Sequence, residues 1–378
     1  MMPEKELEIL WITENYPPNK GGMSQSCDRI VNSLQDLGAK IHILHLSEKT
    51  KIMKRSVVVN GSFTVWPIEQ EIEHSVNLLW LYIENHFNKF KFTHILAFGG
   101  YLPIFLAPVF SKWMKLPLIT LIRGNDFDMS IFSPKKREIL LYALENSEIT
   151  VTISSEKKEK IKKLLPHKSV HQISNGIDVS RWQPLPSDFI KRDKLVAEYK
   201  KQNCRIVGIF GQLKNKKGVD FLIDAIHLSN KQDSIFLLIA GEITDDAIIE
   251  KINTYPIAFS LHSFMDRYDL ISFYMACDIV AIPSFYDGMP NVLLEAGSVG
   301  VPFLGSDTGG ISDFIQHDFN GLLFQPNHID SCAFAIRTFM ELPTERLIEM
   351  GENCKKLISE KYTNTIEAQK YLYLFKQV

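Results

Sequence analysis

Short apolar runs that alternate with longer helical patterns constrain the fold of this chain more than any other feature. The first half opens with apolar runs at residues 7–13 and 40–46. Between them, residues 23–39 have the spacing of an amphipathic helix that ends near a glycine. A strand, a helix and a second strand in this order predict a βαβ unit. The pattern continues with further apolar runs, each followed by a helical pattern, at residues 92–100, 117–124 and 148–154.

The second half of the chain repeats this arrangement. Its apolar runs lie at residues 204–213, 235–241, 277–284, 301–306 and 320–325. We therefore expect an α/β protein with two Rossmann-like, doubly wound parallel-sheet domains. The join is expected within residues 175–189, where glycine and prolines break the pattern. Open sheets of this kind bind ligands at the carboxyl ends of their strands, so two of them facing each other would form a cleft.

Length and charge exclude several classes of protein. With 378 residues, 45% of them hydrophobic, the chain is long enough for two cores. The formal net charge of -2 gives no overall positive field, so we expect no nucleic-acid partner. The N-terminus does not resemble a secretory signal, and no apolar stretch is suited to span a bilayer. Together with five scattered cysteines, which predict reduced thiols, these features predict a cytoplasmic protein.

A pair of glycines follows the first predicted strand. Gly21 and Gly22 come just before a helix that begins near Ser24. Their backbone amides are free to approach an anion at the helix N-terminus, and a plain strand-to-helix turn explains the same residues equally well. The loop is not a GxGxxG motif, and the next strand lacks the acidic residue that would hold a ribose. A nicotinamide dinucleotide is therefore not expected.

Two groups of lysines have a functional and a plain interpretation. Lys214, Lys216 and Lys217 precede a helix, where an ammonium group could neutralise a phosphate, although such loops are usually solvated surface. The lysines within residues 157–163 are typical of an exposed helix face. The alternative for this second group is a weak peripheral contact with anionic lipid.

Two carboxylates flank a predicted helix start in the last third of the chain. Pro290 suits the first position of a helix that runs to about Val299, with Asp287 before it and Glu295 inside it. The helix N-terminus would attract phosphates, and the two acids would accept hydrogen bonds from hydroxyls. The alternative is that Asp287 only helps to start the helix and that Glu295 is solvated. The apolar neighbours of Glu295 argue against this alternative, because an acid without a partner is costly there.

This segment identifies a family. Residues 286–315, YDGMPNVLLEAGSVGVPFLGSDTGGISDFI, resemble the nucleotide-sugar signature of family 4 of the retaining glycosyltransferases, which share the two-domain GT-B architecture. Shorter matches follow the family order along nearly the whole chain, at residues 17–44, 123–126, 173–178, 211–226, 274–284 and 361–375.

The resemblance implies a domain division and a reaction. It implies an N-terminal acceptor domain at 1–185, a C-terminal donor domain at 186–361, and a final helix at 362–378 that packs back on the N-terminal domain. The reaction would move a sugar from a nucleoside-diphosphate sugar to an acceptor hydroxyl with retention, in the synthesis of a polysaccharide, a glycolipid or a small glycoside. The donor is a substrate, and we expect neither a cofactor nor a metal.

The resemblance also implies roles for individual residues. The amides of Gly21 and Gly22 would approach the donor diphosphate, Lys217 would pair with it, and Glu295 would accept from the ribose. Asp287 would hold a hydroxyl of the transferred sugar. The segment of Met289, Pro290, Asn291 and Val292 would face the distal phosphate and the sugar, while Phe264 and Met265 would lie against the base. The residues expected to carry catalysis are Asp287, Lys217 and Arg123.

Three positions depart from the family pattern. Asp287 replaces the usual Glu, Gln212 in the donor site replaces the usual Arg, and Arg123 replaces the usual His. The last change is found in a subset of the family and suits a charged donor or acceptor group. Asp126 and Asp128 imitate the metal-binding DxD of the other glycosyltransferase fold, but we interpret them as loop structure because they lie in the family match around Arg123.

The expected mechanism is attack on the same face that the leaving group departs from, since no protein nucleophile is evident. The leaving phosphate would help to take the acceptor proton. The acceptor, a sugar or a lipid-linked sugar, is expected in the first domain near Arg123 and residues 99–105, with the enzyme in the cytoplasm or peripheral at the inner face of the membrane. Two alternatives remain, a nucleotide-sugar 2-epimerase and a non-catalytic sugar-nucleotide binding subunit.

Overall fold

The computed structural model describes residues 6–19, 21–87, 90–124, 126–199, 204–242, 246–263 and 265–378. The chain divides into two compact units. Unit 1 comprises Met1–Asn175 and Asn364–Val378, and unit 2 comprises Gly176–Thr363. Each unit is an α/β structure around a largely parallel sheet, which confirms the predicted fold class. The division falls after Asn175 rather than after residue 185, and the chain returns to unit 1 at Asn364 rather than at residue 362.

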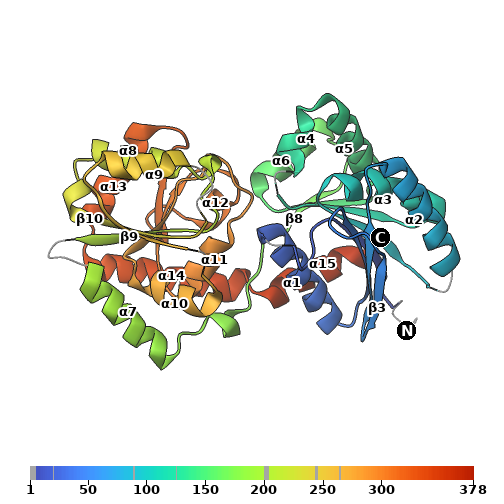
Figure 1. Ribbon diagram of the computed structural model, residues 1–378, viewed down its shortest axis with the longest axis horizontal. Helices are drawn as coiled ribbons and strands as arrows, with labels where there is room; N and C mark the ends of the chain where they lie inside the picture. Colours follow the sequence, from blue (N-terminus) through green and yellow to red (C-terminus); the bar gives the residue numbers. More distant parts are fainter. Residues whose placement is uncertain are drawn as a thin grey trace. The chain divides into compact units, whose positions relative to one another are not determined.

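Unit 1 contains an eight-stranded sheet in the order β3-β4-β2-β1-β5-β6-β7-β8, with helices on both sides (Figure 1). Its strands are β1 (Glu8–Thr13), β2 (Lys40–Ser47), β3 (Lys54–Val58), β4 (Gly61–Pro67), β5 (His94–Phe98), β6 (Leu118–Ile122), β7 (Ile149–Thr152) and β8 (Val170–Gln172). Its helices are α1 (Gly22–Asp36), α2 (Ile72–His86), α3 (Tyr101–Met114), α4 (Asp126–Ile131), α5 (Pro134–Asn146), α6 (Ser155–Leu164) and α15 (Asn364–Phe375). The chain order reverses between β1 and β5, which makes this the switch point of the sheet.

Strand β1 shows why its sequence is a continuous apolar run. Ile9 and Trp11 face one hydrophobic core, to which α1 and α15 contribute. Leu10 and Ile12 face the opposite core, to which α2 and α3 contribute. Successive side chains of a strand point to opposite faces of the sheet, so a central strand with helices on both sides must be apolar at every position.

Unit 2 contains a six-stranded sheet in the order β11-β10-β9-β12-β13-β14, and all its strand pairs are parallel. Its strands are β9 (Arg205–Phe210), β10 (Ile235–Ala240), β11 (Ala258–His262), β12 (Ile279–Ile282), β13 (Phe303–Ser306) and β14 (Gly321–Phe324). Its helices are η1 (Val179–Trp182), α7 (Pro186–Tyr199), η2 (Asn215–Lys217), α8 (Val219–Leu228), η3 (Gln232–Ser234), α9 (Asp246–Thr254), α10 (Arg267–Ala276), α11 (Asn291–Ser298), α12 (Gly309–Phe314), α13 (Ile329–Glu341) and α14 (Thr344–Lys361). The switch point of this sheet lies between β9 and β12. Within the described ranges, none of the helices is both long and apolar enough to span a membrane.

The structure adds a β-hairpin that the sequence patterns above do not predict. Strands β3 and β4 pair antiparallel between residues 54 and 67, and β4 then joins β2 in the parallel sheet. Strand β3 is exposed along its whole length, so it shows neither the continuous apolar run of a buried strand nor a one-sided alternation.

A buried charge cluster holds α15 in unit 1. The carboxylate of Glu367 on α15 accepts from Arg29 Nε at 2.9 Å and from Arg123 Nη2 at 3.2 Å. Asn175, at the end of unit 1, accepts from Arg29 Nη2 at 2.9 Å and also from Arg123. Glu367 and Arg123 are each only 3% exposed. Both segments that continue into unit 2 are therefore held by the same two arginines.

Replacing Glu367 is expected to destabilise the protein strongly. Glu367→Gln keeps the shape of the side chain but leaves the buried guanidinium of Arg123 and the half-buried one of Arg29 without a counter-ion, at a cost of about 3 to 5 kcal/mol. Urea denaturation would measure the change in the free energy of unfolding. Glu360→Gln, at an exposed position of α14, is the matched control and should change it by less than about 0.5 kcal/mol. Equal stability of the two variants would contradict the role given to Glu367.

Candidate functional site

Lys217 and Asp287 lie at the switch point of unit 2. Lys217 ends η2, which follows β9, and Asp287 follows β12, the strand that pairs with β9. Carboxyl ends of neighbouring parallel strands meet at one edge of the sheet, so the two side chains are delivered to the same place. Lys217 lines a small hollow, whose walls also include Pro290 and Val292.

The turn that carries Lys217 is packed tightly against the end of β12. Gly218 has φ +62°, and a Cβ there would lie 2.3 Å from the carbonyl oxygen of Pro283. The backbone N–H of Phe285 donates to the carbonyl of Lys216 at 3.0 Å. Only glycine fits position 218, because the site combines a left-handed backbone with this close approach. The turn and the strand end therefore hold Lys217 in a defined position.

Lys217 and Asp287 form an ion pair with each other. Their side chains are 26% and 15% exposed, so the pair is half-buried. The backbone N–H of Gly288 donates to the Asp287 carboxylate at 2.9 Å. A Cβ on Gly310 would lie 1.8 Å from the Gly288 carbonyl oxygen, so α12 also packs closely on this loop. The two residues expected to contact a donor are thus brought together and neutralise each other.

Helix α11 presents its N-terminal end at the same edge. Pro290 is its N-cap rather than its first residue, and the helix ends at Ser298, one residue before the expected end. Pro290 makes no side-chain hydrogen bond that would cap this N-terminus, and the first turn contains no acidic residue. Its amides, together with the positive end of the helix dipole, are suited to an anion.

Glu295 lies in the second turn of α11, and its carboxylate is oriented by a residue that the sequence analysis missed. The hydroxyl of Tyr274, on α10, donates to Glu295 Oε2 at 2.8 Å. Tyr274 is 1% exposed and packs against Phe210 and Trp182. Burial, and then the negative charge of Glu295, raise the pKa of Tyr274 well above its usual value, so its hydroxyl stays protonated and donates.

A sequence signal for Tyr274 exists, but it is weak. The residue opens the family match at 274–284, in a helix that is otherwise mostly apolar. A buried tyrosine hydroxyl needs a partner. The identity of that partner depends on how α10 and α11 pack, which the sequence does not state.

The other predicted donor residues of unit 2 have varied positions. Met289 and Pro290 are buried, whereas Asn291 and Val292 are partly exposed at the start of α11. Gln212 is exposed, and its amide donates to Glu242 at 3.4 Å. Met265 is partly exposed just before α10. Phe264 lies outside the described residues.

In unit 1, Gly21 and Gly22 lie at the N-terminus of α1, as expected. Gly21 is the N-cap, with φ 117°, and as a glycine it has no side chain to cap the helix. The hydroxyl of Ser24, in the first turn, is buried and has no hydrogen-bond partner among the described residues. This helix end therefore has the features of an anion site, as α11 has in unit 2.

The surroundings of Arg123 differ from those expected for a catalytic residue. Its guanidinium donates to the carbonyl of Ile173 and to the hydroxyl of Tyr371, each at 2.8 Å, as well as to Glu367. With 3% exposure it is part of the interior of unit 1. These hydrogen bonds of Arg123 are made within unit 1 itself, so its surroundings favour a structural role over the predicted catalytic one.

Two carboxylates hold the segment that follows Arg123 by hydrogen bonds and an ion pair. Asp126 accepts from the backbone N–H groups of Gly100, Gly124 and Arg123 at 3.0 to 3.2 Å. Asp128 pairs with Lys157 at 2.6 Å. Both aspartates lie in the first turn of α4 rather than in a loop, so that part of the interpretation is wrong, and their partners are other groups of unit 1.

The first backbone amides of α3, in the expected acceptor region at 99–105, already donate hydrogen bonds to a carboxylate. Glu14 accepts from the backbone N–H of Tyr101 at 2.8 Å and of Leu102 at 3.2 Å. Burial raises the pKa of Glu14, although these two hydrogen bonds oppose the shift. An anionic acceptor group would therefore compete with Glu14 for these amides.

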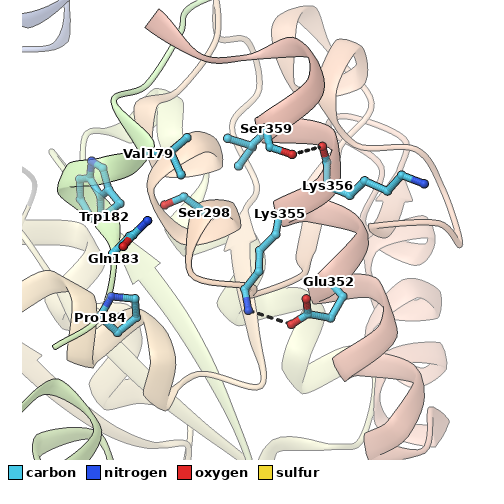
Figure 2. Close-up of a pocket in the computed structure, with 10 residues that line it drawn as sticks. Val179, Trp182, Gln183, Pro184, Ser298, Glu352, Lys355, Lys356 and Ser359 are labelled. Carbon is cyan, nitrogen blue, oxygen red and sulfur yellow. Dashed lines mark hydrogen bonds and ion pairs between the residues drawn. The ribbon is translucent and has the colours of Figure 1, made fainter. Parts of the chain in front are cut away.

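A larger hollow of about 470 Å³ lies elsewhere in unit 2 (Figure 2). Trp182, Ser298, Lys355 and Lys356 are among the residues that line it, and Lys355 pairs with Glu352 at 2.8 Å. Ser298 is the last residue of α11, so this hollow adjoins the opposite end of that helix from Pro290. None of the predicted site residues lines it.

Comparisons with known proteins agree with the motifs. The family described as glycosyl transferases group 1 matches residues 191–357, and the family described as Glycosyltransferase Family 4 matches residues 20–181. An uncharacterized glycosyltransferase of Methanocaldococcus jannaschii is 24% identical, over 94% of this chain and 95% of its own. A GDP-mannose-dependent alpha-(1-6)-phosphatidylinositol monomannoside mannosyltransferase of Mycobacterium tuberculosis is 20% identical, over 91% of each chain.

A solved structure shows the same fold. HepE of Anabaena, crystallised in complex with UDP, has a TM-score of 0.77 and 18% sequence identity, over 98% of this chain and all of its own. The two family models divide most of the chain between them. The chain therefore belongs to the group 1 and family 4 glycosyltransferases, which have the GT-B architecture.

Proposed function

We propose that this glycosyltransferase uses a nucleoside-diphosphate sugar as its donor and transfers the sugar with retention of its anomeric configuration. The observation that carries the proposal is the convergence of Lys217, Asp287 and the N-terminus of α11 at the switch point of unit 2. A cation and a helix N-terminus suit a diphosphate, and carboxylates suit the hydroxyls of two sugars.

The named relatives support this donor class. The mannosyltransferase of Mycobacterium tuberculosis is named as GDP-mannose-dependent. HepE of Anabaena has been crystallised with UDP and with UDP-glucose. These names differ in both base and sugar, so they support a nucleoside-diphosphate sugar without selecting one.

The proposed chemistry is stabilisation of the leaving group. When the anomeric bond breaks, negative charge develops on the diphosphate, where Lys217 and the amides of α11 would stabilise it. Glu295, oriented by Tyr274, would accept from the ribose hydroxyls. Asp287 would exchange Lys217 for a hydroxyl of the transferred sugar, so donor binding would open the ion pair between them.

Retention would follow from attack on the face that the diphosphate leaves, with the departing phosphate taking the acceptor proton. Unit 1 would bind the acceptor, as a sugar or a lipid-linked sugar. Lipid-linked acceptors are supported by the mannosyltransferase relative, whose named acceptor is a phosphatidylinositol mannoside.

A panel of UDP-, GDP- and ADP-sugars tests the proposal. Calorimetry would detect binding, and release of free nucleotide would detect turnover with and without acceptor extracts. Retention would be read from the anomeric configuration of the product by NMR. Turnover of the donor without an acceptor would instead favour an epimerase, and binding without turnover would favour a binding subunit. No binding of any donor would refute the proposal.

Removal of either charged donor contact should weaken donor binding. Lys217→Ala and Glu295→Ala are each expected to raise the Kd of the preferred donor about 10- to 100-fold, the range expected for a hydrogen bond to a charged group. Calorimetry measures this. Lys356→Ala and Glu352→Ala, at two residues that line the larger hollow, are matched controls that should leave the Kd unchanged. If the two control variants raise the Kd whereas Lys217→Ala and Glu295→Ala do not, the donor binds in the larger hollow.

Removal of the Tyr274 hydroxyl should act through Glu295. Tyr274→Phe keeps the packed ring and is expected to weaken nucleoside diphosphate binding about tenfold, while affinity for inorganic pyrophosphate, which has no ribose, stays the same. Tyr373→Phe, at a 68% exposed tyrosine, is the control. In the Glu295→Ala background, Tyr274→Phe should add little. Equal losses for the nucleotide and for pyrophosphate would contradict this positioning role.

Loss of the charge on Asp287 should release Lys217. Asp287→Asn is expected to increase the affinity for the free nucleoside diphosphate severalfold to about tenfold, because a competing carboxylate is removed. It should also lower the rate of sugar transfer, since the amide is a weaker acceptor for a sugar hydroxyl. Calorimetry and product formation measure the two effects. If the affinity for the nucleoside diphosphate falls instead, the ion pair does not compete with the donor.

A further inference from the structure

A continuous exposed segment lies at the outer edge of the unit 1 sheet. Every residue from 51 to 59 is exposed, and we call this segment the hairpin surface. It comprises β3 with the residues on either side of it, and β3 is the first strand in the sheet order (Figure 1). The hairpin surface belongs to none of the sites described above.

The hairpin surface is unusually apolar for its exposure. Val59 is 99% exposed, Val57 is 81% exposed and Ile52 is 71% exposed. These are three of the four most exposed large hydrophobic side chains among the described residues. Val59 lies in the turn after β3, where glycine, asparagine, aspartate or serine would be usual. A valine there contributes nothing to the turn, so its exposure calls for another explanation.

The same segment is basic. Lys51, Lys54 and Arg55 are exposed within it, and no acidic residue occurs between Lys49 and Ile68. The guanidinium of Arg55 lies over the rings of Phe87 and Phe90, at 5.7 and 5.4 Å from their centroids. The hairpin surface therefore combines aliphatic side chains with a local positive charge in a protein whose net charge is -2.

We propose that the hairpin surface docks on an anionic lipid bilayer, with its valines and Ile52 in the headgroup region and its basic residues at the lipid phosphates. Aliphatic side chains beside lysines are the features that bind a protein to such a surface. The proposal goes beyond the proposed function and would bring unit 1 to the place where a lipid-linked acceptor resides.

The geometry favours lipid over a protein partner. Successive side chains of β3 point to opposite faces of the strand, and both sets are exposed, so the aliphatic groups project on two sides. A rigid protein surface would cover one side, whereas a fluid bilayer surrounds both. Lysine and arginine on an edge strand also oppose the addition of a strand from a second copy.

Helix α6, whose lysines were the earlier candidate for a lipid contact, fits less well. Lys157 is buried and paired with Asp128, and Lys160 pairs with Glu156. Leu164 is its one large hydrophobic side chain that is exposed, at 50%. The helix offers charge without a comparable apolar group, so the hairpin surface is the stronger candidate.

Sedimentation with vesicles tests the proposal on the full chain. The protein is expected to sediment with vesicles of equal parts phosphatidylglycerol and phosphatidylcholine, to stay in solution with phosphatidylcholine alone, and to be released by salt. Val57→Asp combined with Val59→Asp should weaken the binding about tenfold or more. Ile348→Asp, the same change at a 60% exposed position of α14, is the control and should bind as the wild type does.

Circular dichroism melting would confirm that the variants fold. If the aspartates disturb β3, Lys51→Glu combined with Lys54→Glu tests the same surface with its valines intact, and an equal loss of binding is expected. The proposal is overturned if the wild type ignores both kinds of vesicle, or if the folded variants bind as it does. It is also overturned if light scattering shows a dimer that the valine variant converts to a monomer. Vesicle binding needs no donor, so a failed donor panel would leave this test intact.

Discussion

The buried cluster of Arg29, Arg123 and Glu367 is the constraint on which the arrangement of unit 1 depends. It holds α15, which returns from unit 2, and Asn175, from which the chain leaves. A carboxylate shared by two arginines is tolerated in an interior only when its geometry satisfies both partners. Arg123, at 3% exposure, is one of those two arginines and lies in the interior of unit 1.

The site in unit 2 differs from this cluster, because its opposite charges pair with each other but are only partly buried. Lys217 and Asp287 remain partly exposed, so a ligand can replace either partner in their ion pair. Glu295 is different, because Tyr274 orients it from the interior. One carboxylate is thus able to change partners, and the other is held in place. This difference suits the proposed donor, whose charged diphosphate would enter the site and whose ribose would be recognised there.

Much of the fold could be predicted because the central strands are apolar at every position, as β1 illustrates. The proximity of Lys217 and Asp287 could be predicted because each lies in the segment after one of two strands, and parallel strands deliver such segments to one edge. Arg123 also follows a strand, yet its side chain extends into the interior. Its partners Glu367 and Tyr371 come from α15, far along the sequence, and sequence spacing carries no information about that packing. The contact between Tyr274 and Glu295 escaped prediction for the same reason.

The valines of the hairpin surface show that an apolar run in the sequence does not by itself predict burial. Ile9 to Ile12 and Val57 to Val59 have comparable composition, but the first run is buried and the second is exposed. The difference lies in the neighbours, since β1 is flanked by β2 and β5 whereas β3 pairs with β4 alone. Apolar exposure at an edge strand is normally reduced by charges, and here lysines are present while the valines remain. The basic residues thus oppose pairing with another strand, and the aliphatic groups remain available for a surface that is not a strand.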